Sequence, residues 1–379
     1  MSQPFLPAFA SPLHVGRPNI GDRAAFLRRV EQILDSCWLT NDGQMVCELE
    51  ARIAASLGVR HCVAVCNGTI ALAIAIRALG LSGEVIVPSW TFVATVHALY
   101  WQGIIPVFAD IDPETHNLSP DAVCRMVTPR TTGIIGVHLW GRPAPVDALQ
   151  SIADEHGLKL MFDAAHAFGN TCKGRSIGNF GACEVFSFHA TKAFNTMEGG
   201  AIVTHDDELA EKARLMRNFG FCGSDNVIHS GINGKMTEVC AAFGLTNLDN
   251  LENVLAANRR NHAAYAEALA DVPGVRLLTY DERERNNLQY VVLEVQEGNP
   301  ASRDEIIAAL HRNNVLARKY FWPGVHAMRP YRELFPHAVS TLPETVKVAE
   351  RNIVLPTGMA VDARMAGKIA AIIARPRHG

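Results

Sequence analysis

The sequence predicts an α/β fold with a mostly parallel central sheet that is covered by helices on both faces. Three observations lead to this prediction. Between residues 46 and about 204, short apolar runs alternate with helical patterns, as is typical of parallel sheets with crossover helices. Several of these runs are apolar at every position, which is expected of central strands buried on both faces. Hydrophobic residues make up 48% and charged residues 19% of the 379 residues, a globular composition that excludes disorder.

The elements are expected in the following order. A loop with Pro18 and Asn19 precedes a helix over residues 22–38, which shows helical spacing of apolar side chains. Strands are then predicted at 61–66, 84–89, 104–110, 132–139, 158–164, 184–188 and 200–204. Helices are predicted between them at 69–80, 91–103 and 145–157. Ligands of such sheets bind beyond the carboxyl ends of the strands, so the site is expected there.

After residue 205 the pattern changes. Helices are predicted at 206–220, 238–272, 302–314 and 363–374, and strands at 275–280 and 289–296. Pro273 and Gly274 are expected to end the long second helix. We therefore expect a large α/β domain over residues 1–250 and a smaller C-terminal α+β domain over residues 251–379.

Charge and cysteine content narrow the class of protein further. The net charge of -3 gives no basic excess that would indicate nucleic acid or an anionic membrane as a partner. No membrane span or signal peptide is evident in the sequence. The nine cysteines form no CxxC pair, so neither a disulfide framework nor a metal site is expected. The expectation is a cytoplasmic protein that acts on small molecules.

Lys192 is the first candidate for chemistry. It lies in FSFHATKAFNTMEGG, between two predicted strands and before Gly199 and Gly200. A lysine next to a buried strand is partly desolvated, which disfavours its charged form and makes its amine a better nucleophile toward a carbonyl. These are the requirements of a Schiff-base lysine. The alternative is a solvated lysine in an exposed loop.

Asp163 is the second candidate, because it directly follows an apolar strand in LMFDAAHAFG. A buried carboxylate is costly unless it is paired, and a protonated pyridine nitrogen is one partner that would justify it. His166 lies three residues further on and could stack on the same ring. The alternative is that Asp163 caps the following helix.

A phosphate seat is the third candidate. In CNGTIALAIAIRALG a strand ends and a helix begins through Asn67, Gly68 and Thr69, so free backbone N–H groups and a hydroxyl could bind phosphate. The same three residues also form an ordinary turn and cap. Neither GxxxxGK[ST] nor GxGxxG occurs in the chain, which argues against a nucleotide triphosphatase or a typical NAD enzyme.

Together, the three segments resemble the pocket of a pyridoxal 5'-phosphate (PLP) enzyme of fold type I. The sequence resembles the DegT/DnrJ/EryC1/StrS family of sugar-nucleotide aminotransferases. The matching strings are WLTNDG, CNGT, VIVPSWTFVAT, GVHLWGRP, DAAHAFG, SFHATKAFNTMEGG, NGKMTE and RKYFWPGVH. They cover nearly the whole chain, and the resemblance implies the aspartate aminotransferase-like fold.

The resemblance also implies roles for individual residues. Lys192 matches the lysine that forms the internal aldimine with PLP and moves the proton, and Asp163 matches the partner of the pyridine nitrogen. His166 stands where many members have Gln, beside the cofactor ring and its phenolic oxygen. The remaining cofactor-binding positions implied are Gly68, Thr69 and Ser187 at the phosphate, Phe92 or alternatively Trp90 stacked on the ring, and Asn233 and Lys235 from a neighbouring subunit.

Substrate-binding residues follow from the same resemblance. Trp38, Leu39 and Thr40 match the N-terminal turn that faces the substrate, and Tyr320, Phe321 and His326 match the loop over the sugar. Plain core packing is the alternative for Trp38 and Phe321. Some relatives are dehydratases with histidine in place of the lysine, and the presence of Lys192 argues against that activity.

The motifs look most like 4-aminotransferases of antibiotic deoxysugar pathways. The implied reaction is ping-pong conversion of dTDP-4-keto-6-deoxyglucose to dTDP-4-amino-4,6-dideoxyglucose, with L-glutamate as donor and pyridoxamine 5'-phosphate as the intermediate cofactor form. The resemblance further implies a homodimer with shared sites. The alternatives are an aminotransferase for a 3-ketosugar or for a cyclitol ketone such as scyllo-inosose, and a non-catalytic PLP-binding regulator.

Overall fold

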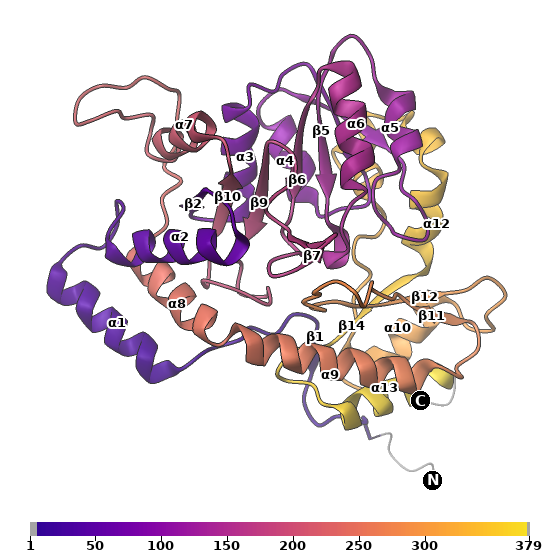
Figure 1. The fold of residues 1–379 in the computed structure, drawn as a ribbon. Coiled ribbons are helices and arrows are strands. Elements are labelled where there is room, and N and C mark those ends of the chain that lie inside the picture. Colours follow the sequence, from indigo (N-terminus) through magenta and orange to yellow (C-terminus); the bar gives the residue numbers. More distant parts are fainter. Residues whose placement is uncertain (1–5, 377–379) are drawn as a thin grey trace.

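A seven-stranded sheet forms the centre of the molecule (Figure 1). The structure is a computed structural model that describes residues 6–376. The strand order is β2-β10-β9-β6-β5-β3-β4. The strands are β2 (His61–Val65), β3 (Glu84–Pro88), β4 (Ile105–Ala109), β5 (Thr131–Val137), β6 (Lys159–Asp163), β9 (Cys183–Ser187) and β10 (Gly200–Thr204). All neighbours pair in parallel except β10, which is antiparallel to both β2 and β9. The mostly parallel sheet is therefore confirmed.

Helices cover both faces of this sheet. Cys62 and Ala64 of β2 belong to one apolar cluster, whereas Val63 and Val65 belong to another on the opposite face. The first cluster is completed by α2 (Gln44–Leu57), α5 (Pro120–Met126), α6 (Val146–His156) and α8 (Glu238–Asp249). The second is completed by α3 (Gly68–Ala78), α4 (Val93–Tyr100) and α7 (Asp207–Arg217). Burial on both faces explains why the strands are apolar at every position.

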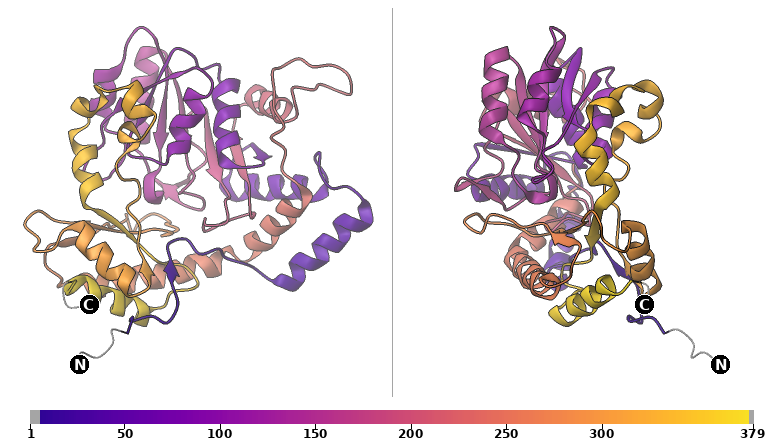
Figure 2. Two further views of the ribbon diagram at one scale, coloured as in Figure 1. Left: turned by 180° about the vertical axis from the view of Figure 1, so that it is seen from behind. Right: turned by 90° about the vertical axis from the view of Figure 1, so that its right-hand side faces the viewer.

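The C-terminal part forms a second, smaller layer beneath the large sheet (Figures 1 and 2). Its antiparallel sheet has the order β11-β12-β14. The elements are β11 (Val275–Leu277), β12 (Val291–Val295), β14 (Asn352–Leu355), α9 (Leu251–Leu269), α10 (Arg303–Arg312) and α13 (Ala363–Ala374). Their apolar side chains share one cluster. We propose a domain boundary near Asn250, which lies between α8 and α9.

Further elements lie outside these two sheets. Strand β1 (Leu13–His14) pairs in parallel with β13 (Val315–Leu316), while α1 (Arg23–Ser36) contacts α8. The remaining elements are the ribbon β7 (Thr171–Cys172) and β8 (Arg175–Ser176), with α11 (Tyr331–Leu334) and α12 (Pro343–Arg351). Within the described residues 6–376, no helix is both long and apolar enough to cross a membrane.

One predicted element differs from the structure. The single helix expected over residues 238–272 is two helices, because residue Asn250 leaves helical geometry at φ -101° and ψ 0°. Apolar spacing continues through this break, since both α8 and α9 bury side chains in the same cluster. The periodic pattern of apolar residues therefore predicts which side chains of 238–272 are buried, but it does not show that the helix is interrupted at Asn250.

Candidate active site

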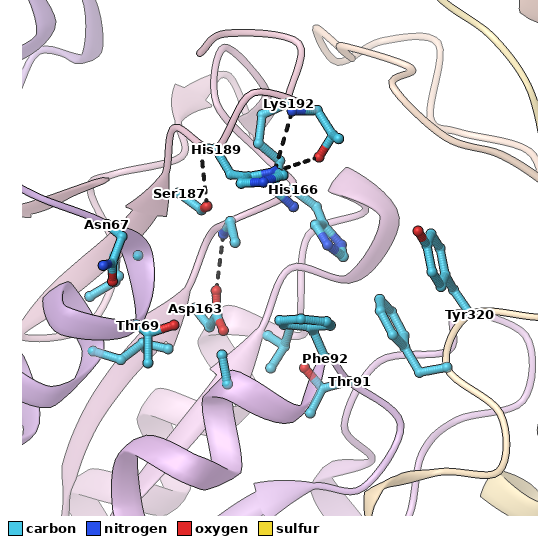
Figure 3. A pocket seen from close by; sticks show the side chains of 18 of the residues that line it. Asn67, Thr69, Thr91, Phe92, Asp163, His166, Ser187, His189, Lys192 and Tyr320 are labelled. Carbon is cyan, nitrogen blue, oxygen red and sulfur yellow. Dashed lines mark hydrogen bonds between the residues drawn. The ribbon is translucent and has the colours of Figure 1, made fainter. Parts of the chain in front are cut away.

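A cavity of about 580 Å³ opens at the carboxyl ends of the parallel strands (Figure 3). The ends of β6 and β9 and the beginnings of α3 and α4 line it. Nine residues predicted from the sequence lie around this one cavity: Gly68, Thr69, Phe92, Asp163, His166, Ser187, Lys192, Tyr320 and Phe321. The topology thus brings the three separate sequence segments together.

Lys192 lies in the turn that follows β9, with its side chain half-buried in the cavity. Its Nζ lies 3.4 Å from the Tyr290 hydroxyl and 5.9 Å from the centre of the Tyr290 ring. Burial lowers the pKa of Lys192 to about 8, and the nearby Asp163 carboxylate opposes that shift. The neutral amine, which is the state that attacks a carbonyl, is therefore far more populated near neutral pH than in an ordinary lysine.

Asp163 ends strand β6 and is only 6% exposed. Its Oδ1 accepts a hydrogen bond from the Ala165 N–H at 3.0 Å, and its Oδ2 accepts one from the Thr95 hydroxyl at 2.8 Å. Burial raises the pKa of Asp163, while these two hydrogen bonds and Lys192 oppose the rise. A turn follows Asp163 in place of a helix, so the helix-cap alternative does not apply.

His166 lies beside Asp163 in the cavity wall and is 5% exposed. Its Nδ1 accepts a hydrogen bond from the backbone N–H of Trp140 at 3.2 Å. The ring is nearly parallel to those of Trp140 and Phe321, with centroids 6.0 and 5.9 Å away. Burial and the Lys192 charge hold the pKa of His166 well below its usual range, so the ring is neutral.

The start of α3 forms a narrow cradle against the end of β9. Asn67 caps the helix, since its Oδ1 accepts a hydrogen bond from the Ile70 N–H at 2.9 Å. A Cβ atom on Gly68 would lie 2.9 Å from the Cβ of Ser187, so only glycine fits. Hydroxyls of Thr69 and Ser187 flank the helix N-terminus, and this set of donors suits a phosphate group.

Two aromatic candidates for ring stacking occupy different environments. Phe92 lines the cavity and is 56% exposed, whereas Trp90 is fully buried and does not line it. Tyr320 and Phe321 close the opposite side of the cavity, with Phe321 6.1 Å from Phe92 between ring centroids.

Six predicted site residues lie outside the cavity of their own chain. His326 is buried, and its Nδ1 is hydrogen-bonded to the Ser89 hydroxyl at 2.7 Å. Lys235 donates a hydrogen bond to Asn218 at 3.0 Å. The other four residues outside the cavity are Trp38, Leu39, Thr40 and Asn233, of which Trp38 and Leu39 are more than half exposed.

Two residues that the sequence analysis did not single out contact candidate residues of this cavity: Thr95, which is hydrogen-bonded to Asp163, and Tyr290, which lines the cavity. Thr95 lies one helical turn after Thr91, and their hydroxyls are 3.0 Å apart. The four-residue spacing of these two threonines, directly after strand β3, was a sequence signal for a polar pair at the start of α4. Tyr290 precedes a C-terminal strand, and no local pattern indicates that its hydroxyl reaches Lys192.

Comparisons with known proteins agree with this geometry. The sequence model of the DegT/DnrJ/EryC1/StrS aminotransferase family matches residues 21–374. A dTDP-4-amino-4,6-dideoxy-D-glucose transaminase of Escherichia coli is 35% identical over 362 residues, which are 95% of this chain and 97% of that protein. A protein of the same description from Shigella dysenteriae is 38% identical, covering 84% of this chain and 87% of its own. The crystal structure of DesI, determined in the presence of its TDP-sugar product, superimposes with a TM-score of 0.94 at 50% identity, covering 98% of this chain and 96% of that one.

Proposed function

The chain belongs to the DegT/DnrJ/EryC1/StrS aminotransferase family, and from that premise we propose that it aminates dTDP-4-keto-6-deoxyglucose at C4. The product is dTDP-4-amino-4,6-dideoxyglucose, and L-glutamate is the amino donor. One observation carries the proposal. Lys192, Asp163 and the cradle at Gly68 line the same cavity, as a PLP-dependent aminotransferase requires.

The residues present suit PLP chemically. The cradle of Thr69, Ser187 and the α3 N-terminus would hold the phosphate, and Phe92 would cover one face of the ring. Asp163, buried and hydrogen-bonded, would hold a proton on the pyridine nitrogen. When bound, PLP supplies an aldehyde carbon that carries the amino group and a protonated ring that withdraws electrons.

Lys192 has two tasks in this proposal. Its neutral amine would hold the cofactor at the aldehyde carbon when no donor is bound. With the donor bound, Nζ would accept the proton from the donor's Cα and release it again, because its lowered pKa allows both gain and loss of a proton near neutral pH. L-Glutamate would leave as 2-oxoglutarate, with water supplying the ketone oxygen and the amino group retained for the ketosugar, and the same side chain would move the proton in the second half-reaction.

The choice of ketosugar is supported by the similar proteins. Two curated relatives are described as dTDP-4-amino-4,6-dideoxy-D-glucose transaminases, and the DesI structure contains a TDP-sugar product. The alternatives are a 3-ketosugar nucleotide or a cyclitol ketone such as scyllo-inosose. A panel of dTDP-linked and UDP-linked ketosugars and scyllo-inosose, assayed with glutamate and with glutamine, separates these cases.

We further propose that two copies of the chain share their sites as a homodimer. Trp38, Leu39 and Lys235 lie outside the cavity of their own chain, yet the family resemblance assigns them to a site. Mixing two inactive variants tests this. Hybrids of Lys192→Ala with Lys235→Ala contain one intact composite site and should regain activity, whereas no recovery on subunit exchange would contradict sharing.

An absorbance scan of the purified protein tests the core of the proposal. The protein should be yellow and should bleach when glutamate is added, because the first half-reaction removes the conjugated aldehyde. A protein that binds PLP and stays yellow with every amino donor would instead be the non-catalytic regulator.

A further inference from the structure

Three buried histidines receive hydrogen bonds from the same short segment, residues 138–144. The Trp140 backbone N–H donates to Nδ1 of His166 at 3.2 Å, and the Trp140 indole N–H donates to Nδ1 of His116 at 3.1 Å. The Ala144 N–H donates to Nδ1 of His138 at 2.9 Å. An imidazole nitrogen that accepts an N–H carries no proton itself, so each neutral ring has its proton on Nε2.

Two of these three Nε2–H groups have an acceptor. His116 donates to Glu294 at 2.5 Å, and His138 donates to Glu184 at 2.7 Å. The Nε2 of His166 has no hydrogen-bond partner among residues 6–376, and this ring is the one that lines the active-site cavity. The Nε2–H of His166 is therefore the one donor of these three without an acceptor among the described residues, and it belongs to the ring that lines the cavity.

Trp140 is held firmly in the conformation that directs its N–H at His166. Its φ of 61° is in the left-handed region, which is unfavourable for a tryptophan and persists only where the surroundings impose it. The side chain is fully buried and stacks on Phe321 with centroids 5.2 Å apart. Gly141 follows at φ 86°, where a Cβ would lie 2.9 Å from the His166 carbonyl oxygen.

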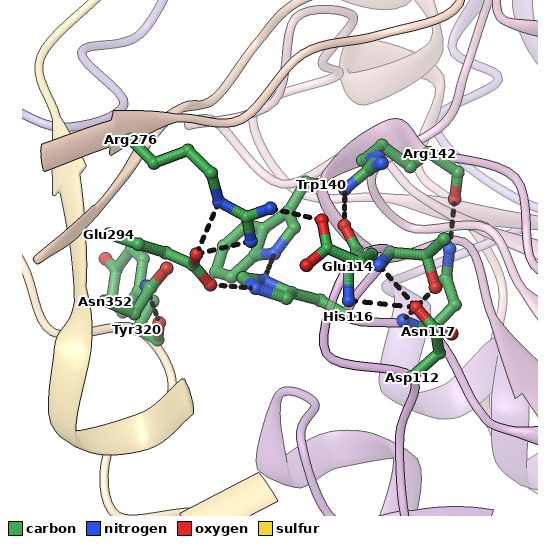
Figure 4. A network of polar contacts seen from close by, with 11 residues as sticks. Asp112, Glu114, His116, Asn117, Trp140, Arg142, Arg276, Glu294, Tyr320 and Asn352 are labelled. Carbon is green, nitrogen blue, oxygen red and sulfur yellow. Dashed lines mark hydrogen bonds and ion pairs between the residues drawn. The ribbon is translucent and has the colours of Figure 1, made fainter. Parts of the chain in front are cut away.

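The indole is anchored through a chain of polar contacts to the C-terminal layer (Figure 4). His116, which accepts the indole N–H, is bonded to Glu294 of β12, and Glu294 also accepts two hydrogen bonds from Arg276 of β11. Arg276 in turn pairs with Glu114. The position of Trp140 therefore depends on β11 and β12, far along the sequence from the cavity.

From this geometry we infer that Trp140 is a positioning residue, which locks His166 as the neutral Nε2–H tautomer so that it can only donate a hydrogen bond into the cavity. A second proton on Nδ1 would face the Trp140 N–H, so the cationic ring is excluded, and Nε2 has no lone pair with which to act as a base. The ligand atom opposite must be an acceptor oxygen. If the proposed function holds, this atom is the phenolic oxygen of PLP.

The tautomer is measurable without cofactor. We would label the cofactor-free protein with ¹⁵N-histidine and record long-range ¹H–¹⁵N spectra from pH 5.5 to 8.5, with His166→Gln to assign the signal. Lys192 and Tyr290 are the titratable groups that face the ring. His166 should remain the Nε2–H tautomer throughout the range. A titration of His166 within it, or the Nδ1–H tautomer, would overturn the inference, whether or not PLP is the true ligand.

A double-mutant cycle tests the role of Trp140. Trp140→Phe keeps an aromatic ring but removes the donor that anchors it to His116, and Trp101→Phe at a 93% exposed site is the matched control. Affinity for pyridoxamine 5'-phosphate is measured by equilibrium dialysis, since this ligand forms no bond with Lys192. Losing one hydrogen bond to a charged oxygen should weaken binding roughly tenfold or more in His166→Leu.

The two substitutions should not be additive if Trp140 acts through His166. Trp140→Phe should weaken binding of pyridoxamine 5'-phosphate severalfold in the native background and have no further effect in His166→Leu. The Trp101→Phe control should leave the affinity unchanged in both backgrounds. In the NMR experiment, Trp140→Phe should show a second His166 tautomer. Equal losses in both backgrounds, or an unchanged His166 spectrum, would mean that Trp140 contributes packing alone and would refute the assignment.

Discussion

Thr95 and Asp163 are joined by a hydrogen bond from helix α4 to strand β6, in which the threonine hydroxyl donates to Oδ2 at 2.8 Å. The other oxygen, Oδ1, accepts the Ala165 N–H. These two donors favour the charged form of the buried Asp163 and oppose the rise in its pKa that burial causes.

Replacing Thr95 with valine removes that donor at nearly constant volume. The pKa of Asp163 should rise further, so less of the carboxylate is ionised and able to hold a proton on the pyridine nitrogen. Loss of one hydrogen bond to a charged group costs roughly 1.5–3 kcal/mol, so kcat should fall about tenfold or more. The acidic limb of the pH–rate profile should move to higher pH, because the ionised form is the active one.

Thr95→Ser is the matched control for this prediction, since it keeps the hydroxyl. It should retain most of the activity and the original acidic limb. If valine and serine variants had the same pH profile, Thr95 would have no influence on Asp163.

Removing the amine of Lys192 should abolish both turnover and colour. In Lys192→Ala, the visible absorbance of the lysine-bound cofactor should disappear and the rate with glutamate and ketosugar should fall to background. Stopped assays and an absorbance spectrum of the same sample measure both. A fully active variant would exclude the assigned role. Asp163→Ala, by contrast, should still bind phosphate but lose turnover.

The lowered pKa of Lys192 also predicts a pH-dependent stability of the cofactor-free protein. Because the pKa of Lys192 is about 8 in the folded protein and the ordinary lysine pKa is 10.5, the unfolded chain binds more protons between these values. Lys192 thus destabilises the fold most below pH 8, and this cost fades as pH rises toward 10.5. After allowance for water reaching this half-buried amine, the cost is about 1–2 kcal/mol.

Lys192→Met should consequently raise the free energy of unfolding at pH 7 and leave it nearly unchanged at pH 10.5. Urea unfolding of the cofactor-free wild type and variant at both pH values measures the difference. The same gain at both pH values would show that the effect comes from packing and not from the charge.

A methyl group at Gly68 should close the phosphate cradle. Its Cβ would lie 2.9 Å from the Ser187 Cβ, so the turn or the strand end must shift. Gly68→Ala should weaken binding of pyridoxamine 5'-phosphate at least tenfold, a change of about 1.4 kcal/mol. Gly367→Ala in α13, where no atom lies within 4 Å of the added Cβ, is the control and should bind normally. Equal affinities of the two variants would place the phosphate elsewhere.

Much of the fold was predictable because strands that are buried on both faces consist of apolar residues at every position. Val63 and Val65 face one cluster and Ala64 the other, so a continuous apolar run indicated a strand covered on both faces. Helix α2 was not among the predicted elements, although it packs Leu49 and Ile53 against the sheet. The short strands β1 and β13 were not predictable, since a pairing of two residues has no periodicity.

Some residues of the candidate site were predictable from the sequence in the same way, and others were not. Lys192, Asp163 and Gly68 lie at or just after the ends of strands of one sheet, so the rule that ligands bind at the carboxyl ends of parallel strands predicts that they lie close together. The placement of His326 near the sugar stays a prediction, and local sequence could not show that its ring is hydrogen-bonded to Ser89. Tyr290 and Trp140 contact residues distant in sequence, and such contacts leave no local pattern, whereas the spacing of Thr91 and Thr95 was a local signal for a polar pair.

The pairing of Leu13 in β1 with Val315 in β13 has a consequence for how the chain reaches its native state. Strand β1 is synthesised about 300 residues before its partner β13, so it has no native partner until β13 has left the ribosome. Contacts between such distant segments raise the contact order and slow folding. We therefore expect that a fragment ending before β13 leaves residues 6–20 exposed to proteolysis, whereas in the full chain this segment unfolds together with the three-stranded sheet.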